Sequence, residues 1–433
     1  MERGERFSFG GWEREDGRVR FAFRCSRFGD FHETVDLGDD GVVPPALLNL
    51  LHAALGVSTY KAAAARRVDL PPLTPAGRRM VEALYTHGLA EFFVRSELAY
   101  PPGTEFFGEV IEAAPEARPC PAGGTPMVAF GGGKDSYVAG AIVERATGTK
   151  PRFASVVLSE SVAKTLTRTA PYTPLFIRRT LDPRLSTLEG AFGGHVPITA
   201  INMMAMTAVG YLSGASMILF ANERSADEPT MVVGGEPANH QYSKSSGFEA
   251  LVRRAVHEAA PDAPPTYSVL RPFSELWIAR AFSQLKPAFG RFTSCNRNFR
   301  LAGDAERRWC GACAKCAFTS LVLSPFMSED EAVSVFGANF LDCANRQPIY
   351  RELCGLGPHK PWDCVGTIDE CQAALHLLAR DSGWRAARVV GEVMPELAAI
   401  KGTEQLDRQV SEALQPGERG SLPASLYRAA RSS

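Results

Sequence analysis

The chain begins with an alternation of apolar and polar positions that predicts strands. Two runs, at residues 7–12 and 19–23, place aromatic or aliphatic side chains at about every second position, which is typical of strands with one buried face. Between residues 45 and 100 the apolar positions recur at helical spacing instead. We therefore predict an N-terminal α+β accessory domain at residues 1–125, which ends in a Pro/Gly-rich linker at 115–126.

Beyond this linker, short apolar runs alternate with helical patterns. This order is typical of parallel strands joined by right-handed crossovers, so we predict an open parallel α/β sheet at residues 126–290. Ligands of such sheets bind at the carboxyl ends of the strands. Strands are predicted at 127–130, 153–158, 175–177 and 217–220, and helices at 136–146, 201–212 and 274–285.

An uncharged stretch at residues 196–222 is long enough to cross a membrane. The sequence Ser-Gly-Ala-Ser at 213–216 interrupts it and separates a helical half from a β-rich half. A helix, a turn and a buried strand explain this pattern better than a membrane span. We therefore predict no membrane contact.

The last third of the chain is predicted to be helical, with a cysteine-rich start. Helices are expected at 317–323, 329–336 and 369–378, and Ser328 followed by Glu331 has the spacing of a capping box. This gives a C-terminal helical region at 291–400. The remaining tail, 401–433, is polar, and we expect part of it to be disordered.

Composition narrows the possible functions. The 433 residues include 47 Lys and Arg against 48 Asp and Glu, a formal net charge of −1, which argues against a nucleic-acid coat or a polybasic membrane binder. The first eighteen residues contain no apolar run typical of a secretory signal, so we expect a cytoplasmic protein with reduced thiols. Clustered cysteines in such a protein indicate metal ligands or catalytic groups.

A glycine-rich loop joins the predicted strand at 127–130 to the following helix. It consists of Phe130, Gly131, Gly132 and Gly133, followed by Lys134, Asp135 and Ser136. Glycines allow close approach of the backbone to an anion, and the helix that follows presents its unpaired N–H groups there. In such a loop the Lys side chain neutralises phosphate charge, the Asp helps to hold Mg²⁺ and the Ser donates to a phosphate oxygen.

The spacing differs from both a Walker A loop and the dinucleotide fingerprint. It resembles the Ser-Gly-Gly-x-Asp-Ser loop of the PP-loop ATP pyrophosphatases, with Gly131 where most members carry serine. That family cleaves ATP to AMP and pyrophosphate while it adenylates a carboxyl or amide oxygen. The resemblance therefore implies ATP and Mg²⁺ as cofactors.

Four cysteines lie close together in the C-terminal region. Three follow a Cys-x2-Cys-x2-Cys pattern and a fourth stands a short loop upstream: Cys295, Cys310, Cys313 and Cys316. Four thiolates suit a tetrahedral, structural Zn²⁺, which we favour, although an iron–sulfur cluster needs the same ligands. Unligated buried thiols are the third interpretation. Similar thiols occur in the 7-cyano-7-deazaguanine synthases, which this chain also resembles in the glycine loop.

Eight runs in the same order resemble a narrower family, the UDP-N-acetyl-α-D-muramoyl-L-alanyl-L-glutamate epimerases (MurL). Together they span most of the chain. The runs lie at 56–61, 88–92, 130–136, 194–202, 222–225, 239–245, 295–316 and 359–366.

This resemblance implies inversion of the terminal L-Glu of a UDP-muramoyl dipeptide to D-Glu, driven by ATP. An α-proton beside an ionised carboxylate is very weakly acidic, and acid–base groups alone supply only about 10² to 10⁴-fold acceleration. Adenylation of the carboxylate would make the α-proton removable and release AMP and pyrophosphate. A Mur ligase that adds L-Glu is the expected functional partner.

Several polar residues are candidates for the chemistry at the ends of the strands. Cys364 stands near two cationic residues in its loop, which favours a lowered pKa for its thiol, and His240 and Lys244 form a second polar set. We interpret Cys364, His240 and Lys244 as candidate proton carriers, with hydrogen-bonded loop residues as the alternative. Nucleotide and Mg²⁺ contacts are predicted where the strand at 217–220 ends, at Asn222, Glu223 and Arg224.

Three other functions stay open at this point. A PP-loop enzyme that modifies a nucleobase would need ammonia or a sulfur donor. A MurL-like epimerase could act on a peptide of another pathway. A non-catalytic nucleotide-binding scaffold would bind ATP without releasing AMP.

Overall fold

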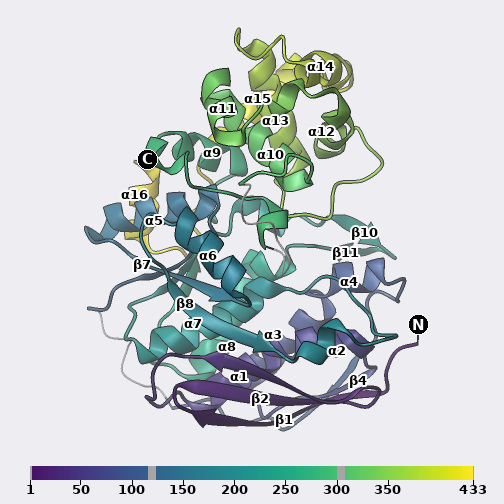
Figure 1. Ribbon diagram of the computed structural model, residues 1–433, viewed down its shortest axis with the longest axis vertical. Coiled ribbons are helices and arrows are strands. Elements are labelled where there is room, and N and C mark those ends of the chain that lie inside the picture. Colours follow the sequence, from purple (N-terminus) through teal and green to yellow (C-terminus); the bar gives the residue numbers. More distant parts are fainter. Residues whose placement is uncertain (1, 116–122, 300–307, 433) are drawn as a thin grey trace.

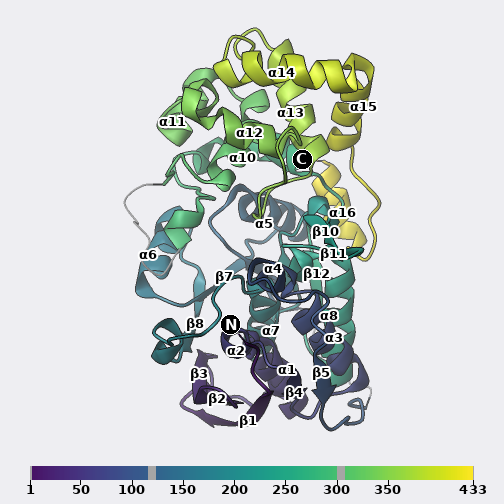
Figure 2. The ribbon, with the colours of Figure 1, turned by 90° about the vertical axis from the view of Figure 1, so that its right-hand side faces the viewer.

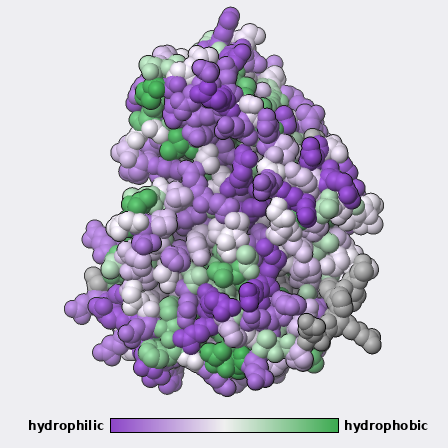
Figure 3. All heavy atoms as spheres, turned by 180° about the vertical axis from the view of Figure 1, so that it is seen from behind, coloured by the Kyte–Doolittle hydropathy of each residue, from purple (hydrophilic) through white to green (hydrophobic). Residues whose placement is uncertain are grey.

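A computed structural model describes residues 2–115, 123–299 and 308–432. In Figure 1 the N-terminal strands lie at one end of the molecule and the C-terminal helices at the other. The predicted linker at 115–126 falls mostly outside the described residues. Figure 3 shows hydrophilic side chains over most of one face, with hydrophobic ones in small separate groups.

Ten of the described strands form one sheet in the order β12-β9-β6-β7-β8-β3-β2-β1-β4-β5. The five strands from β12 to β8 are parallel, and β8 pairs antiparallel with β3. A separate hairpin is formed by β10 (Met231–Val233) and β11 (Glu236–Ala238). The strands of the large sheet are β1 (Arg6–Glu15), β2 (Arg18–Cys25), β3 (Gly29–Asp36), β4 (Arg67–Asp69), β5 (Glu105–Phe107), β6 (Met127–Ala129), β7 (Arg152–Val157), β8 (Leu175–Leu181), β9 (Ile218–Phe220) and β12 (Thr266–Ser268).

The order of the parallel strands produces a crevice beside β6. The chain continues from β6 to β7 and β8 on one side, and then returns to place β9 and β12 on the other side. Ligands of open α/β sheets bind where the strand order reverses, at the carboxyl ends. The predicted mixed α/β architecture is confirmed, whereas its assignment to the PP-loop type stays a prediction.

Both faces of β6, β7 and β9 are buried over most of their length, which explains their continuous apolar runs, whereas β8 has one exposed face. Met127 belongs to one hydrophobic core and Val128 to the other, because successive side chains of a strand point to opposite faces. The described helices of the N-terminal and central parts are α1 (Pro45–Leu55), α2 (Val57–Ala63), α3 (Pro75–Thr86), α4 (Ala90–Arg95), α5 (Lys134–Thr147), α6 (Glu160–Thr169), α7 (Ile198–Leu212), α8 (Ser246–Ala259) and α9 (Glu275–Ser283). Buried residues of α1, α3, α7 and α8 belong to the first core and those of α5 and α9 to the second.

The uncharged stretch forms the predicted helix, turn and strand. α7 is followed by the turn at 213–216 and then by β9, whose three residues are buried. In the part of the chain that the structure describes, no helix has both the length and the apolar character that a membrane crossing requires.

The C-terminal region is helical, as predicted. The capping box at Ser328 and Glu331 is present, and its helix has the predicted bounds. The helices of this region are α10 (Ala314–Leu323), α11 (Glu329–Phe336), α12 (Gln347–Leu353), α13 (Ile368–Arg380), α14 (Arg388–Lys401), α15 (Thr403–Leu414) and α16 (Ala424–Arg431). Figure 2 shows α10 to α15 stacked beyond the central strands, whereas α16 returns to the central part and packs against α5.

The expectation of disorder in the tail is wrong for its described residues. α15 and α16 are amphipathic and bury Leu406, Leu426 and Ala430 in the second core, and Leu422 of the segment between them is buried there too. The few apolar side chains of this polar segment have helical spacing, so they cover neighbouring helices while the charged ones face solvent.

An ion pair joins the N-terminal strands to the parallel strands. Arg179 of β8 contacts Glu33 of β3 and donates from Nη2 to Ser58 Oγ at 2.7 Å; both charged side chains are almost completely buried. The sheet is therefore continuous between the predicted segments 1–125 and 126–290. The predicted domain division itself stays a prediction.

Candidate functional site

A cavity of about 490 Å³ lies at the crevice beside β6. The glycine loop forms one wall, and residues at the carboxyl ends of β7 and β9 form the next. Segments of the C-terminal region close the cavity with Thr293, Ser294, Lys315 and Cys364. The cavity thus brings together residues that are more than 230 positions apart in the sequence.

The glycine loop adopts a conformation at Gly132 that would be strained for any residue other than glycine. Gly132 has φ +78°, and a Cβ there would lie 3.0 Å from Thr169 Oγ1. Gly133 precedes α5, and no side chain caps the start of that helix. The first N–H groups of α5 are therefore available to an anion, while Phe130, Gly131, Gly133 and Ser136 line the cavity.

Lys134 does not line the cavity, contrary to its expected phosphate contact. Its side chain is 1% exposed and lies between the carboxylates of Asp135 and Glu275. Burial lowers the pKa of Lys134, but the two carboxylates outweigh burial and raise it. The Lys134 charge is thus neutralised within the protein, and Lys134 supports Asp135.

Three oxygen-bearing side chains that could hold Mg²⁺ line the cavity. Burial raises the pKa of Asp135, but Lys134 and Lys315 outweigh burial and lower it, so Asp135 is ionised. Asn222 and Glu223, at the end of β9, are each 5% exposed and also line the cavity. Carboxylate and amide oxygens are suitable ligands for this ion.

Arg224 points away from these groups. Its backbone N–H donates to Phe273 O at 3.0 Å, and its Nη2 donates to Glu412 O at 3.5 Å. Arg224 does not line the cavity. The predicted contact between Arg224 and a phosphate or carboxylate of a ligand therefore finds no support in this arrangement.

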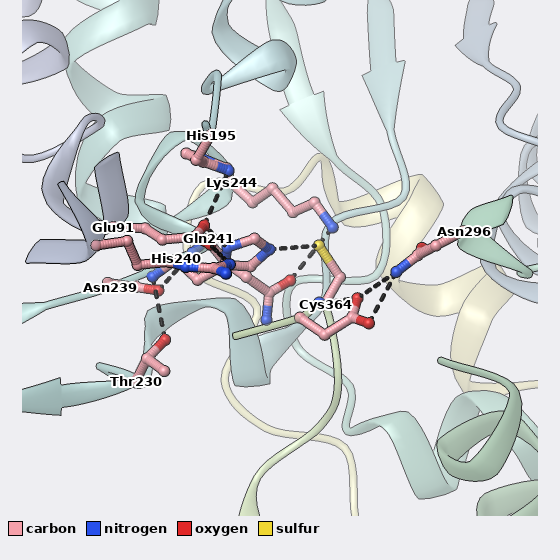
Figure 4. Close-up of polar contacts among 11 residues, drawn as sticks. Glu91, His195, Thr230, Asn239, His240, Gln241, Lys244, Asn296 and Cys364 are labelled. Carbon is pink, nitrogen blue, oxygen red and sulfur yellow. Dashed lines mark hydrogen bonds and ion pairs between the residues drawn. The ribbon is translucent and has the colours of Figure 1, made fainter. Parts of the chain in front are cut away.

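Cys364 and His240 are brought together at the far wall of the cavity (Figure 4). Cys364 Sγ lies 3.6 Å from His240 Nε2, and His240 Nδ1 lies 2.5 Å from Glu91 Oε2. The same Glu91 oxygen lies 3.1 Å from His195 Nδ1. A carboxylate thus orients the imidazole whose other nitrogen faces the thiol.

The charges around Cys364 favour a thiolate. Burial raises its pKa, but Lys244, His240 and Lys315 outweigh burial and lower it to about 6. Burial lowers the pKa of His240, but Cys364 and Glu91 outweigh burial and raise it to about 9. Between these values the two groups form a thiolate–imidazolium pair.

Two lysines that line the cavity, Lys244 and Lys315, and a neutral histidine that does not line it, His195, surround the Cys364–His240 pair. Lys244 Nζ donates to Gln241 Oε1 at 3.2 Å, and Figure 4 shows its ammonium group beside the sulfur. Lys315 Nζ donates to the backbone oxygen of Cys364. Burial and the His240 charge lower the pKa of His195 to about 3, so His195 is neutral.

The four clustered cysteines converge as predicted. Their sulfur atoms lie within 4.8 Å of one another, with Cys310 and Cys316 at 3.8 Å and Cys313 and Cys316 at 3.4 Å. Tetrahedral coordination with Zn–S bonds of about 2.3 Å needs sulfur atoms about 3.8 Å apart. The donor set and its spacing therefore fit Zn²⁺.

A second group of potential metal ligands is Glu91, His195 and His240. Both histidines direct Nδ1 at the same Glu91 oxygen. The contact between His240 and Glu91 is a hydrogen bond.

Sequence reasoning missed four residues of this site: Glu91, His195, Glu275 and Lys315. Glu91 and His195 lie inside the runs at 88–92 and 194–202 that resemble the MurL family. The runs therefore indicated the family, but not that these two residues belong to one site. Glu275 is the first residue of α9, and Lys315 lies in the first turn of α10. Both helices are mainly apolar, and this pattern does not indicate that the two charged residues belong to a site.

Comparisons with known proteins identify the family of the chain. A family model described as the MurL N-terminal domain matches residues 2–269, and one described as the MurL C-terminal domain matches residues 291–408. Proteins named UDP-N-acetyl-alpha-D-muramoyl-L-alanyl-L-glutamate epimerase are 40% identical in a Micromonospora species, 41% in Salinispora tropica and 35% in Xanthomonas oryzae. Each match covers 81% of this chain and 78 to 79% of the relative.

Proposed function

The chain belongs to the MurL family, and we propose that it inverts the terminal L-Glu of UDP-MurNAc-L-Ala-L-Glu to D-Glu. In this proposal ATP adenylates the carboxylate next to the α-carbon, and the reaction releases AMP and pyrophosphate. Both family models and the relatives' printed names support the epimerase activity.

The proposal of ATP dependence rests on one observation: two sets of groups share the same cavity. It is lined by the glycine loop, which has the features of an anion site, and by Cys364 of the thiolate–imidazolium pair. Adenylation and proton transfer must act on neighbouring atoms of one glutamate. An enzyme that performs both needs the two groups in one cavity.

Each wall then has a defined task. The N–H groups at the start of α5 bind phosphate oxygens. Asp135, Asn222 and Glu223 hold Mg²⁺, which neutralises phosphate charge when bound. Lys244 and Lys315 stabilise negative charge that develops on the carbonyl oxygen, and the cluster of Cys364, His240 and Lys244 supplies the groups that move the proton.

Zn²⁺ has a structural task in this proposal. The cysteine cluster adjoins the cavity, because Thr293 and Ser294 precede Cys295, and Lys315 stands between Cys313 and Cys316. A bound Zn²⁺ would fix the positions of these three cavity residues. An iron–sulfur cluster has the same ligands, and metal analysis distinguishes the two.

The substrate also implies a partner reaction and a compartment. A Mur ligase that adds L-Glu to UDP-MurNAc-L-Ala would supply the dipeptide nucleotide. We propose that the enzyme acts beside that ligase in the cytoplasm.

The test is an assay of both products. The protein is incubated with UDP-MurNAc-L-Ala-L-Glu, ATP and Mg²⁺ in D₂O, and the expected products are D-Glu with α-deuterium, AMP and pyrophosphate. Asp135→Ala should abolish D-Glu and AMP together, because it removes the Mg²⁺ ligand.

Asp330→Ala is the matched control. Asp330 is also the second residue of a helix, α11, but it is exposed and remote from the cavity. This variant should keep both products. Epimerisation by the wild type without ATP would contradict the proposal.

A further inference from the structure

Glu91, His240 and Cys364 form a chain of contacts that ends at the cavity. The carboxylate holds Nδ1 of the ring, and Nε2 of the same ring faces the sulfur. Nucleophilic thiols of acyl-transfer enzymes are activated by such an imidazole, which a third group orients. The same arrangement suits a thiolate that attacks a carbonyl carbon in the cavity.

The position of Cys364 agrees with a nucleophile. Of the cysteines that the structure describes, Cys364 alone lines the cavity. Two cations, Lys244 and Lys315, lie next to it, one beside the sulfur and one on its backbone oxygen. They can stabilise the oxyanion that forms when a sulfur attacks a carbonyl carbon.

We propose that Cys364 forms a thioester with the carboxyl group of the substrate, with His240 as its proton partner and Glu91 as a positioning residue. This inference rests on the proposed function, which supplies the acyl-adenylate in the same cavity. The thioester is the species that loses and regains the α-proton.

The steps balance in atoms and charge. The thiolate attacks the carbonyl carbon, the C–S bond forms, and the C–O bond to the phosphate breaks as AMP leaves with its electron pair. His240, no longer paired with a thiolate, releases its proton to solvent and becomes available to accept the α-proton. His240 keeps the α-proton, and a proton from solvent adds to the α-carbon on the opposite face. Water then cleaves the C–S bond, which restores the thiolate and the carboxylate and releases two protons.

Glu91 acts only through the ring that it orients. His195 holds the same carboxylate oxygen, and Arg95 Nη1 donates to the other oxygen at 3.1 Å. This fixes the imidazole with Nε2 toward Cys364. The charged groups that act on the sulfur are His240 and Lys244 from one segment and Lys315 from α10. Asp363 contacts the backbone of Cys364 instead, because its Oδ1 accepts from the Cys364 N–H at 2.8 Å.

The test searches for the adduct by mass spectrometry. The full-length protein is mixed with UDP-MurNAc-L-Ala-L-Glu, ATP and Mg²⁺, quenched in acid within a single turnover, and digested. The expected result is a peptide that carries the dipeptide nucleotide on Cys364 and loses it to hydroxylamine. Cys364→Ala should give no adduct and no D-Glu, yet still release AMP slowly as water hydrolyses the acyl-adenylate.

Cys343→Ala is the matched control, because Cys343 donates its thiol to Asn339 O and lies outside the cavity. It should form the adduct as the wild type does. Glu91→Gln should slow adduct formation at least tenfold at neutral pH and move its pH dependence to higher pH, a change that a loss of stability alone would not cause.

The outcomes separate this inference from the proposed function. D-Glu and AMP with no adduct at any quench time would overturn the thioester and leave the epimerase intact. An adduct on another cysteine would also overturn it. Absence of both D-Glu and AMP would overturn the proposed function together with the thioester.

Discussion

Replacing Lys244 with methionine tests the electrostatic origin of the Cys364 thiolate. The charge of Lys244 is the largest single contribution that lowers the pKa of Cys364; the hydrogen bond and the charge of His240 and the charge of Lys315 follow. Methionine keeps much of the side-chain volume and removes the charge. The pKa of the thiol should therefore rise.

The magnitude follows from the structure. The pKa falls from 9.0 to about 6 in the folded protein, which corresponds to about 4 kcal/mol in favour of the thiolate. A neighbouring opposite charge typically shifts a pKa by about one to three units. At pH 7 the wild-type thiol should be about 90% ionised, and loss of Lys244 should reduce its reactivity about twofold to about 90-fold.

The assay is alkylation by iodoacetamide between pH 5 and 10, followed at the Cys364 peptide by mass spectrometry. The rate should rise with pH through about 6 in the wild type and through a higher midpoint in Lys244→Met. Lys164→Met, an exposed change on α6, should keep the wild-type midpoint. A wild-type midpoint near 9, or equal midpoints in the wild type and Lys244→Met, would refute the reasoning.

Three further predictions concern stability. Gly132→Ala should lower the free energy of unfolding by about 1–2 kcal/mol in urea titrations, because alanine is strained at positive φ. A Cβ at Gly131 meets open space, so Gly131→Ala should change this free energy little. Equal losses of free energy in the two variants would contradict this. Metal analysis should find one zinc per chain, and Cys313→Ser should lower both the zinc content and the melting temperature; full stability without zinc would exclude a structural ion. Burial lowers the pKa of His52 from 6.5 to about 4. The contribution of neutral His52 to the free energy of unfolding is therefore complete above pH 6.5, and about 3 kcal/mol is lost as pH falls through 4. His52→Phe should flatten the pH dependence of the free energy of unfolding over this interval, and an unchanged slope would contradict the assignment.

Local patterns predicted the elements whose own residues specify them. The capping box placed α11 correctly, and the Ser-Gly-Ala-Ser turn separated α7 from β9. The pairing of β3 with β8 was not predicted, because Glu33 breaks the apolar alternation of its strand. Its partner Arg179 lies 146 positions away, so no local pattern reveals why a carboxylate can be buried there.

The site was predictable in its parts but not in its arrangement. His240, Lys244 and Cys364 were candidates from their sequence neighbourhoods, yet the contact between His240 and Cys364 joins positions 124 apart. Lys134 was expected to contact phosphate, and the neighbouring Glu275 that neutralises it comes from a distant helix. Part of the tail was expected to be disordered because it is polar and contains Pro and Ser near its end, yet its few apolar residues have the helical spacing of α15 and α16.

The central claim is that the carboxylate is joined to AMP before the α-proton moves. Its most direct test uses UDP-MurNAc-L-Ala-L-Glu with ¹⁸O in both oxygens of the α-carboxylate, incubated with the protein, ATP and Mg²⁺. If the carboxylate attacks the α-phosphorus, AMP must carry one ¹⁸O for each D-Glu formed. D-Glu accompanied by AMP without ¹⁸O would contradict the account.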